Sequence, residues 1–240
     1  MKKYSIASVV LVLWVIAVAA ADDIDTWIKQ LKNINSSDRV AAAKQLGTTK
    51  DPRAVNPLVS AMRDDRNWEV RLAAEDALVS IGSYSTEPLI QVLKEEKTCF
   101  PKRRAARALE QIKDPCATEG LMKAAAEDAD CCVRRFAARA LGEIGSPEAA
   151  KFLDQAMRKK NMDVVSGAYQ YYVRKGEPGT EEILLEAMKY CSYDRKMVSD
   201  LARCRNDKLS QAATEVAKKH GYPIPADWAG PIWGKASPPR

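Results

Sequence analysis

Residues 128–145 read DADCCVRRFAARALGEIG, and this stretch decides the fold. It contains the motif Arg-x-x-Ala-x-x-Ala-Leu, which runs from Arg134 to Leu141. The alanines recur at helical spacing, and small side chains on one helix face let a neighbouring helix approach closely. Gly145 follows the motif, as glycine commonly follows the end of a helix. The stretch therefore predicts a helix that packs tightly against others like it.

The motif recurs along the chain at a nearly constant period. Its last apolar residue, called here the anchor of each copy, falls at Leu46, Leu78, Leu109, Leu141, Tyr172 and Leu201. Successive anchors are 32, 31, 32, 31 and 29 residues apart. A second landmark follows each anchor by 11 or 12 residues, at Leu58, Leu89, Leu121, Leu153, Leu184 and Ala213. A fixed period of this length indicates a repeat architecture.

Each copy predicts two helices joined by a turn. The first helix carries the motif, and the turn contains Gly or a proline, which suits the first turn of the helix that follows. The second helix carries an apolar stripe, such as Leu89, Ile90 and Leu93 in the second copy. A single copy cannot bury this stripe, so the copies must stack on one another. No stretch shows the alternation typical of strands, and the sequence predicts an all-α solenoid.

At this period, the pattern Asp-x-x-x-Val-Arg-x-x-Ala-Ala-x-Ala-Leu-Gly-x-Ile-Gly resembles HEAT repeats of the phycobilisome-lyase type. The resemblance extends over roughly residues 25–219 and is strongest in the second, third and fourth copies. It implies a right-handed α-solenoid of about six HEAT-like helical hairpins with an inner, concave layer of helices. We assign this array to residues 22–221.

The two ends of the chain differ from the array. Residues 1–21, MKKYSIASVVLVLWVIAVAAA, have a positive start, an apolar run and a small-residue end, the layout of a secretory signal peptide cleaved after Ala21. An uncleaved membrane anchor is the alternative, although the apolar run is shorter than the roughly 20 residues that a spanning helix needs. The signal peptide predicts a periplasmic or secreted bacterial protein, with no membrane span after cleavage.

The tail, residues 222–240, is rich in proline and contains Trp228 and Trp233. So many prolines exclude a helix. Either the two tryptophans fold back over the open end of the stack, where a terminal repeat otherwise exposes core, or the tail docks a partner.

Charge and histidine content exclude several function classes. The formal net charge is +6, and removal of Lys2 and Lys3 with the signal peptide leaves +4, with both signs interspersed. We therefore expect no nucleic-acid partner, because such proteins cluster basic residues on one face. His220 is the only histidine, which excludes histidine-rich metal sites and haem motifs. We expect no cofactor, no metal and no catalytic residues.

Cysteine positions in the repeat register predict a cross-link between copies. Cys99, Cys131 and Cys191 each lie ten residues before an anchor, where the chain enters the first helix. Cys99 and Cys116 are at opposite ends of one helix, too far apart for a disulfide. A bond from Cys99 to Cys131 or Cys132 is the favoured interpretation. Unbonded cysteines, a vicinal Cys131–Cys132 bond and a metal site are the alternatives.

Basic residues divide into structural and partner-binding candidates. Arg39, Arg71, Lys102 and Arg134 share one register position, and in the resembled family this position forms an ion-pair ladder between neighbouring repeats. The other arginines of the first helices are expected on a solvated outer face. The second helices are expected to line the concave side. The partner-binding candidates there are Gln91, Lys94, Lys123, Lys151 and Arg158, with Trp228 and Trp233 from the tail.

Three functions remain open on the sequence. The first is an exported, non-enzymatic scaffold or adaptor that binds another protein on its concave face. The second, implied by the resemblance, is an enzyme or enzyme subunit like the bilin lyases. The third is a periplasmic protein that handles thiols or metals through its cysteines.

Overall fold

The computed structural model describes residues 23–192, 194–224 and 231–235. The predicted signal peptide and Trp228 lie outside these residues. Residues 23–30 form a helix, and the chain continues through α-helices and short 3-10 helices (η). These are α2 (Ser36–Thr49), η1 (Pro52–Ala54), α3 (Val55–Asp64), α4 (Trp68–Ile81), η2 (Gly82–Ser85), α5 (Thr86–Glu95), α6 (Cys99–Ile112), η3 (Pro115–Ala117), α7 (Thr118–Glu127), α8 (Cys131–Ile144), α9 (Pro147–Arg158), α10 (Met162–Gly167), α11 (Tyr169–Lys175), α12 (Thr180–Tyr190), α13 (Arg195–Leu201) and α14 (Asp207–His220). The described residues contain no strand, and the predicted all-α solenoid of helical hairpins is confirmed.

The predicted repeat register matches the buried core. All six anchors are fully buried, as are all six second landmarks from Leu58 to Ala213. The anchor in the fifth copy is Tyr172, whose hydroxyl donates a hydrogen bond to the Leu153 carbonyl at 2.7 Å. A tyrosine can replace leucine there because its one polar atom has a buried acceptor. The anchor and the second landmark of each copy are thus both part of the buried core.

Capping side chains fix where many of the helices begin. Asn67, Asp130, Ser146, Asn161, Asp194 and Asn206 each accept a hydrogen bond from a backbone N–H in the first turn of the helix that they precede. A cap of this kind contributes about 1 kcal/mol, since it satisfies a donor that has no partner within the helix. The prolines of η1, η3 and α9 occupy early positions, as the turn pattern predicts.

The chain divides into two compact units, Met1–Leu89 and Ile90–Arg240, with the boundary inside α5. Unit 1 is built on α4, which packs against both α2 and α3. Helices α2 and α4 approach so closely at Gly47 that a Cβ there would lie 2.8 Å from the Ala77 Cα. The small residues of the motif therefore set the helix spacing in unit 1, as predicted.

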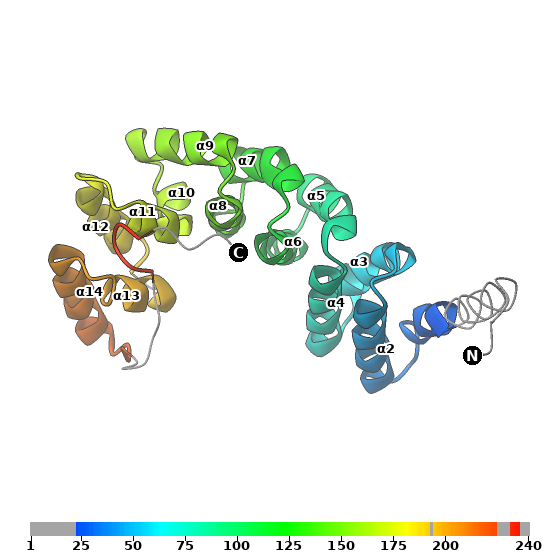
Figure 1. Cartoon of the computed structure of the whole chain (residues 1–240). Coiled ribbons are helices and arrows are strands. Elements are labelled where there is room, and N and C mark those ends of the chain that lie inside the picture. The colour runs from blue at the N-terminus through cyan, green and yellow to red at the C-terminus, as the bar shows by residue number, and fades with distance from the viewer. Residues whose placement is uncertain (1–22, 193, 225–230, 236–240) are drawn as a thin grey trace, which may run out of the picture. The chain divides into compact units, whose positions relative to one another are not determined.

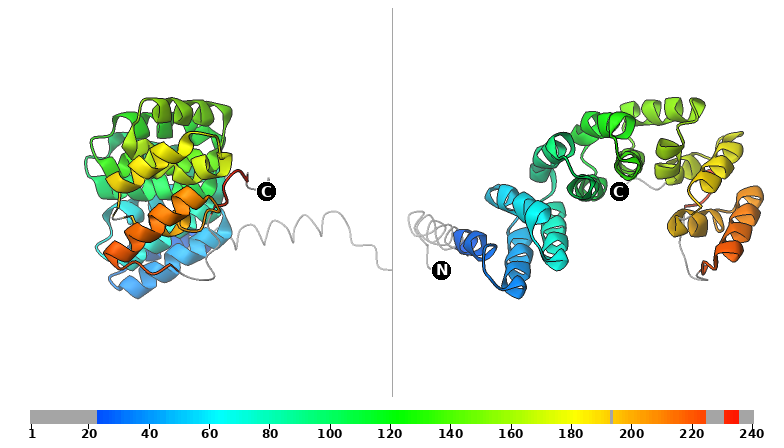
Figure 2. Two further views of the ribbon diagram at one scale, coloured as in Figure 1. Left: turned by 90° about the vertical axis from the view of Figure 1, so that its left-hand side faces the viewer. Right: turned by 180° about the vertical axis from the view of Figure 1, so that it is seen from behind.

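Unit 2 has two layers of helices. Its concave layer is formed by the first helices of the copies and not, as predicted, by the second helices. In Figure 1 and Figure 2, the first helices α6, α8, α10, α11 and α13 line the inner side of the curve, while α7, α9, α12 and α14 lie outside. The prediction that second helices line the concave side is wrong. Small residues explain the result, because helices that approach more closely occupy the shorter, inner arc. At Gly167, for example, a Cβ would lie 2.3 Å from the Arg135 carbonyl oxygen.

The fifth and sixth copies depart from a plain hairpin. The first helix of the fifth copy is interrupted at Ala168 and forms two short helices, α10 and α11. The break directly follows Gly167, where α10 touches the backbone of α8. The first helix of the sixth copy, α13, has only 7 residues. These are the copies in which the sequence motif is weakest, since neither keeps the full run of alanines.

Part of the tail returns to the array. Within residues 231–235, called here the strap, the Trp233 N–H donates to the Cys204 carbonyl at 2.7 Å. The Gly234 N–H donates to the Val173 carbonyl at 3.0 Å, and a Cβ on Gly176 would lie 2.4 Å from the Gly234 backbone. The strap therefore joins the ends of α11 and α13 and links the fifth copy to the sixth. The tail thus folds back onto the array, but at the seam between these copies and not over the open end of the stack, as the fold-back interpretation had it.

Candidate functional site

The inner layer of unit 2 is strongly basic. Helices α6, α8, α10, α11 and α13 carry 11 lysines and arginines but only 4 acidic residues. The outer helices α7, α9, α12 and α14 carry 7 basic and 9 acidic residues. The interspersed charges of the sequence therefore conceal a separation of charge between the two layers of unit 2. The predicted placement of the first-helix arginines on an outer face is wrong.

A cleft of about 270 Å³ opens within this basic layer. Its walls come from three successive copies: α8 of the fourth, α10 and α11 of the fifth, and the start of α13 in the sixth. The lining residues are Cys132, Arg135, Phe136, Arg139, Ser166, Gly167, Tyr169, Asp194 and Arg195. Aromatic surface and guanidinium groups thus line the same concave site.

Ion pairs and ring contacts hold the arginines of the cleft in place. Arg135 contacts the Asp194 carboxylate at 2.5 Å, a link between residues 59 positions apart. Arg139 binds Glu110 of α6 at 2.8 Å, and its guanidinium lies 4.7 Å from the centroid of the Phe136 ring. Contacts on two sides order a flexible side chain before any ligand arrives, which lowers the entropy cost of binding.

Beside the cleft, a buried polar cluster joins α11 to α13. The Asp200 carboxylate is fully buried and accepts hydrogen bonds from the Tyr169 hydroxyl at 2.5 Å and from Gln170 at 2.7 Å. Lys196 pairs with the same carboxylate at 2.8 Å. Burial, together with the Asp200 charge, raises the pKa of the Tyr169 hydroxyl well above its usual value. The tyrosine therefore stays protonated and acts as a donor that fixes one wall of the cleft.

The predicted ion-pair ladder is present between neighbouring copies. Arg39 binds Asp65 at 2.6 Å, Lys102 binds Asp128 at 2.7 Å, and Arg134 binds Asp163 at 2.5 Å. In each pair the acid belongs to the turn or helix start of the next copy. The Asp163 hydrogen bond is the main cause of the raised pKa of the Arg134 guanidinium.

Arg71, the remaining ladder residue, donates to the Asp65 carbonyl at 2.7 Å. Arg39 and Arg134 make the same kind of bond to carbonyls at the entry of their own helices. The ladder arginines therefore brace the entry turn of their own helices, and Arg39 and Arg134 also join two copies through an acid of the next copy.

The three clustered cysteines lie at the entry to α6 and α8. Cys99 and Cys131 begin these helices. The predicted bond from Cys99 to Cys131 or Cys132 is not present, because none of the six cysteines forms a disulfide in this structure. The Arg103 guanidinium donates to the Cys99 sulfur at 3.0 Å. Burial, then the neighbouring Cys131 and Asp130, raise the pKa of the Cys132 thiol. The described residues include no group of three or more His, Cys, Asp or Glu side chains arranged to hold a metal.

The predicted partner-binding residues of the second helices lie on the outer layer. Lys123 is on α7, and Lys151 and Arg158 are on α9, and both helices lie in the outer layer of unit 2 (Figure 1). Gln91 and Lys94 are on α5, in the part of this helix that belongs to unit 2. These residues are thus separated from the basic cleft, and the reasoning that selected them from a concave location is wrong.

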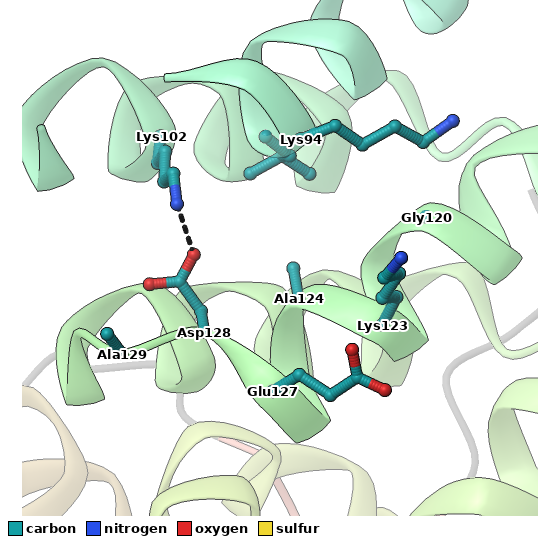
Figure 3. Close-up of a pocket in the computed structure, with 9 residues that line it drawn as sticks. Lys94, Lys102, Gly120, Lys123, Ala124, Glu127, Asp128 and Ala129 are labelled. Atoms are coloured by element: carbon teal, nitrogen blue, oxygen red, sulfur yellow. Dashed lines mark hydrogen bonds and ion pairs between the residues drawn. The ribbon is translucent and has the colours of Figure 1, made fainter. Parts of the chain in front are cut away.

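Two of these residues nevertheless share a second cleft. Lys94 and Lys123 border a space of about 240 Å³ that extends to the Lys102–Asp128 ion pair, as Figure 3 shows. Glu127 lies at the same border. The lining of this second cleft contains both positive and negative side chains, and Lys102 is already paired with Asp128. This cleft has neither the aromatic lining nor the concentration of positive charge of the inner one.

The sequence reasoning missed Phe136, Tyr169, Asp194 and Arg195 as site residues, and it assigned Arg135 and Arg139 to the wrong layer. A signal for part of the site was available in α8, because residues 132, 135, 136 and 139 share the face opposite the buried alanines.

Trp233, a partner-binding candidate, lies in the strap and is partly covered by the array. None of the described helices has both the length and the apolar character needed to cross a bilayer.

Comparison with known proteins identifies the repeats. A family model described as HEAT repeats matches residues 24–98 and 86–173, more than half of the 240-residue chain. No curated protein matches the sequence.

Several solved structures resemble the chain. One is the complex of CpcE and CpcF of phycocyanin lyase from Nostoc sp. PCC7120, at 20% identity over 82% of this chain and 87% of that one, with a TM-score of 0.48. An engineered protein is 20% identical over 82% of this chain and 97% of its own, with a TM-score of 0.38. A designed armadillo repeat protein is 16% identical over 80% of this chain and 98% of its own, with a TM-score of 0.39.

Proposed function

This chain belongs to the HEAT-repeat family, and we propose that it is an interaction scaffold that binds an acidic segment of a partner protein in the inner cleft of unit 2. The observation that carries the proposal is the gathering of 11 basic residues on the inner helices, beside an outer layer with a slight acidic excess. Stacked repeats suit this role, because their inner helices form one extended surface.

The chemistry of the cleft favours a segment that carries both carboxylates and apolar side chains. Arg139 and Arg195 can donate charge-assisted hydrogen bonds to carboxylates, the stronger class of hydrogen bond. Phe136 and Tyr169 offer ring surface to an aliphatic or aromatic side chain between them. An acidic segment would also relieve the repulsion among the arginines of the layer. Charge complementarity of this kind raises the rate of association and the specificity of binding.

The test is the binding of a fluorescent peptide of alternating glutamate and leucine, followed by polarisation at low and moderate salt. We expect binding that weakens as salt increases, because ions screen exposed charges. The same peptide with glutamine in place of glutamate should bind at least tenfold more weakly.

Two matched variants locate the site. Arg195 at the inner cleft and Arg158 on the outer helix α9 are both exposed arginines. Arg195→Gln should weaken binding roughly five- to tenfold, whereas Arg158→Gln should leave it unchanged. Equal losses for the two variants would refute the inner cleft as the site. An oligonucleotide that binds more tightly than the peptide would refute a protein partner and would restore the nucleic-acid class that the composition argued against.

We also propose that the scaffold acts outside the cytoplasm. Support comes from residues 1–21, whose sequence has the layout of a signal peptide. Expression of the full chain in an exporting bacterial host should yield a periplasmic protein whose N-terminal sequencing begins at Asp22. A chain that keeps Met1 and sediments with membranes would instead support the membrane anchor.

A further inference from the structure

We propose that the acidic partner segment extends beyond the inner cleft onto a second binding surface, called here the α6 subsite, which consists of Phe100, Arg104 and Arg107. The residues that line the cleft come from α8, α10, α11 and the start of α13, so α6 adds a separate surface to it. This inference rests on the proposed function, because it follows the same bound segment into the preceding copy.

The α6 subsite and the α8 wall of the cleft occupy the same helix face in neighbouring copies. The α8 wall includes Cys132, Phe136 and Arg139. The third and fourth anchors are 32 residues apart, and residues 100, 104 and 107 each lie 32 positions before one residue of this wall. Both sets follow the spacing i, i+4 and i+7, which places them on one helix face. Since α6 and α8 both belong to the inner layer (Figure 1), the face that forms the cleft wall in α8 carries the α6 subsite in the third copy.

The α6 subsite also repeats the ring-and-guanidinium pair of the cleft. The Arg104 guanidinium lies 4.9 Å from the centroid of the Phe100 ring, and that of Arg139 lies 4.7 Å from the centroid of the Phe136 ring. The Phe100 residue is 40% exposed, so its ring still offers apolar surface. Arg107, one turn further along α6, is exposed as well. Each helix therefore combines a ring with positive charge, which suits an apolar side chain next to a carboxylate.

The two surfaces are continuous and close enough for one short segment to reach both. Helices α6 and α8 pack against each other, and the ion pair of Glu110 with Arg139, at 2.8 Å, joins them. Equivalent points on packed helices lie about 8–10 Å apart. An extended chain advances about 3.3 Å per residue, so about three residues cover this distance.

Charge on α6 favours an acidic occupant. This helix carries 4 basic residues and a single acid, Glu110, which is paired with an arginine of α8. A carboxylate placed beside Arg107 would therefore meet mainly positive charge on this helix. The excess of positive charge that supports binding in the cleft thus continues across the α6 subsite.

The test compares two fluorescent peptides of alternating glutamate and leucine, one of four residues and one of ten, by polarisation with the full chain. Extended, they span about 13 Å and about 33 Å, so only the longer one can fill the cleft and the α6 subsite together. Phe100→Ser should weaken binding of the ten-residue peptide roughly five- to tenfold and leave that of the four-residue peptide unchanged. Arg107→Gln should weaken the longer peptide about threefold.

Matched variants control for the loss of an exposed ring or charge elsewhere. Tyr84→Ser removes an exposed aromatic side chain in unit 1, and Arg158→Gln removes an exposed arginine of the outer layer. Both should bind the ten-residue peptide as tightly as the unaltered chain does. All four variants should keep the unfolding temperature within a few degrees, because the changed side chains are exposed.

The outcomes separate this inference from the function on which it rests. If Phe100→Ser and Arg107→Gln bind the longer peptide normally while Arg195→Gln weakens it, the segment ends inside the cleft and the α6 subsite alone is refuted. If neither peptide binds the unaltered chain, the proposed function fails with it. A ten-residue oligothymidylate that binds more tightly than the longer peptide, and loses affinity in Phe100→Ser, would assign the subsite to nucleic acid, because bases stack on exposed rings.

Discussion

Replacement of Gly167 by alanine tests the packing that brings the inner helices together. Gly167 ends α10 and faces the backbone of α8, the inner helix of the preceding copy. An added Cβ would lie 2.3 Å from the Arg135 carbonyl oxygen and 2.9 Å from the Arg135 Cα. These are backbone atoms within a helix, so they cannot rotate away as the end of a side chain would. The two helices must separate to admit the methyl group.

The expected loss of stability follows from this separation. A carbon and a carbonyl oxygen pack at about 3.3 Å or more, so α10 must move by about 1 Å. Overpacking of this kind costs about 1–3 kcal/mol, and the cost should lie at the upper end where both partners are backbone. The better helix propensity of alanine returns at most about 1 kcal/mol. The net loss is about 2 kcal/mol, a decrease of about 4–8 °C in unfolding temperature for a chain of this size.

Urea unfolding followed by circular dichroism measures this change, with Gly142→Ala as the matched control. A Cβ on Gly142 would meet the Tyr171 Cβ at 3.1 Å, a contact that a shift of a few tenths of an ångström relieves. The control should therefore change stability by less than about 1 kcal/mol. If Gly167→Ala is as stable as Gly142→Ala, helices α8 and α10 are not in backbone contact, and the explanation of the inner layer by close approach is refuted.

Three further predictions concern the ladder, an acid-sensitive ion pair and the strap. A double-mutant cycle on Lys102→Ala and Asp128→Ala should give a coupling free energy of about 1 kcal/mol in urea unfolding, and additive losses would contradict the ladder. For Glu143, burial raises the pKa, but two neighbouring cations outweigh it and hold the pKa below its usual value. Its contribution to stability is therefore present above the unfolded pKa of about 4.3 and is lost as the pH falls through the lower folded value. Glu143→Gln should show a smaller loss of unfolding temperature on acidification, and parallel pH curves would count against this. Deletion of residues 222–240 should lower the unfolding temperature by a few degrees, since the strap makes two backbone hydrogen bonds to the array; an unchanged midpoint would instead assign the tail to docking.

The buried positions of each copy could be predicted from the sequence, because the motif recurs with the same period as the structural repeat. Each anchor from Leu46 to Leu201 is buried in its own copy. Aligning the repeats with one another therefore located all six buried anchors. The ladder was also predictable, because its basic residues share a register position. Interactions within a copy, or between equivalent points of adjacent copies, leave a periodic trace in the sequence.

The concave layer and the cleft were not predictable in this way. Which helix of each pair lies inside depends on how closely the first helices of successive copies approach, and Gly167 sets part of that spacing through a contact with the α8 backbone. The cleft combines residues as distant as Arg135 and Asp194, and two of its three copies, the fifth and the sixth, interrupt or shorten their first helix. A repeat pattern carries no information about such departures, because they are the positions where the repetition fails.

The unequal charge of the two layers has a mechanical consequence. Like charges on the inner helices repel one another along the shorter arc, where the helices are closest, and this repulsion opposes the curvature that the alanines and glycines permit. Because the Debye length is about 10 Å at 0.1 M salt and about 30 Å at 0.01 M, the opposition grows as ions are removed. We therefore expect the inner helices of unit 2 to separate slightly in dilute buffer and to approach one another when salt or an acidic ligand neutralises the arginines that have the fewest acidic neighbours.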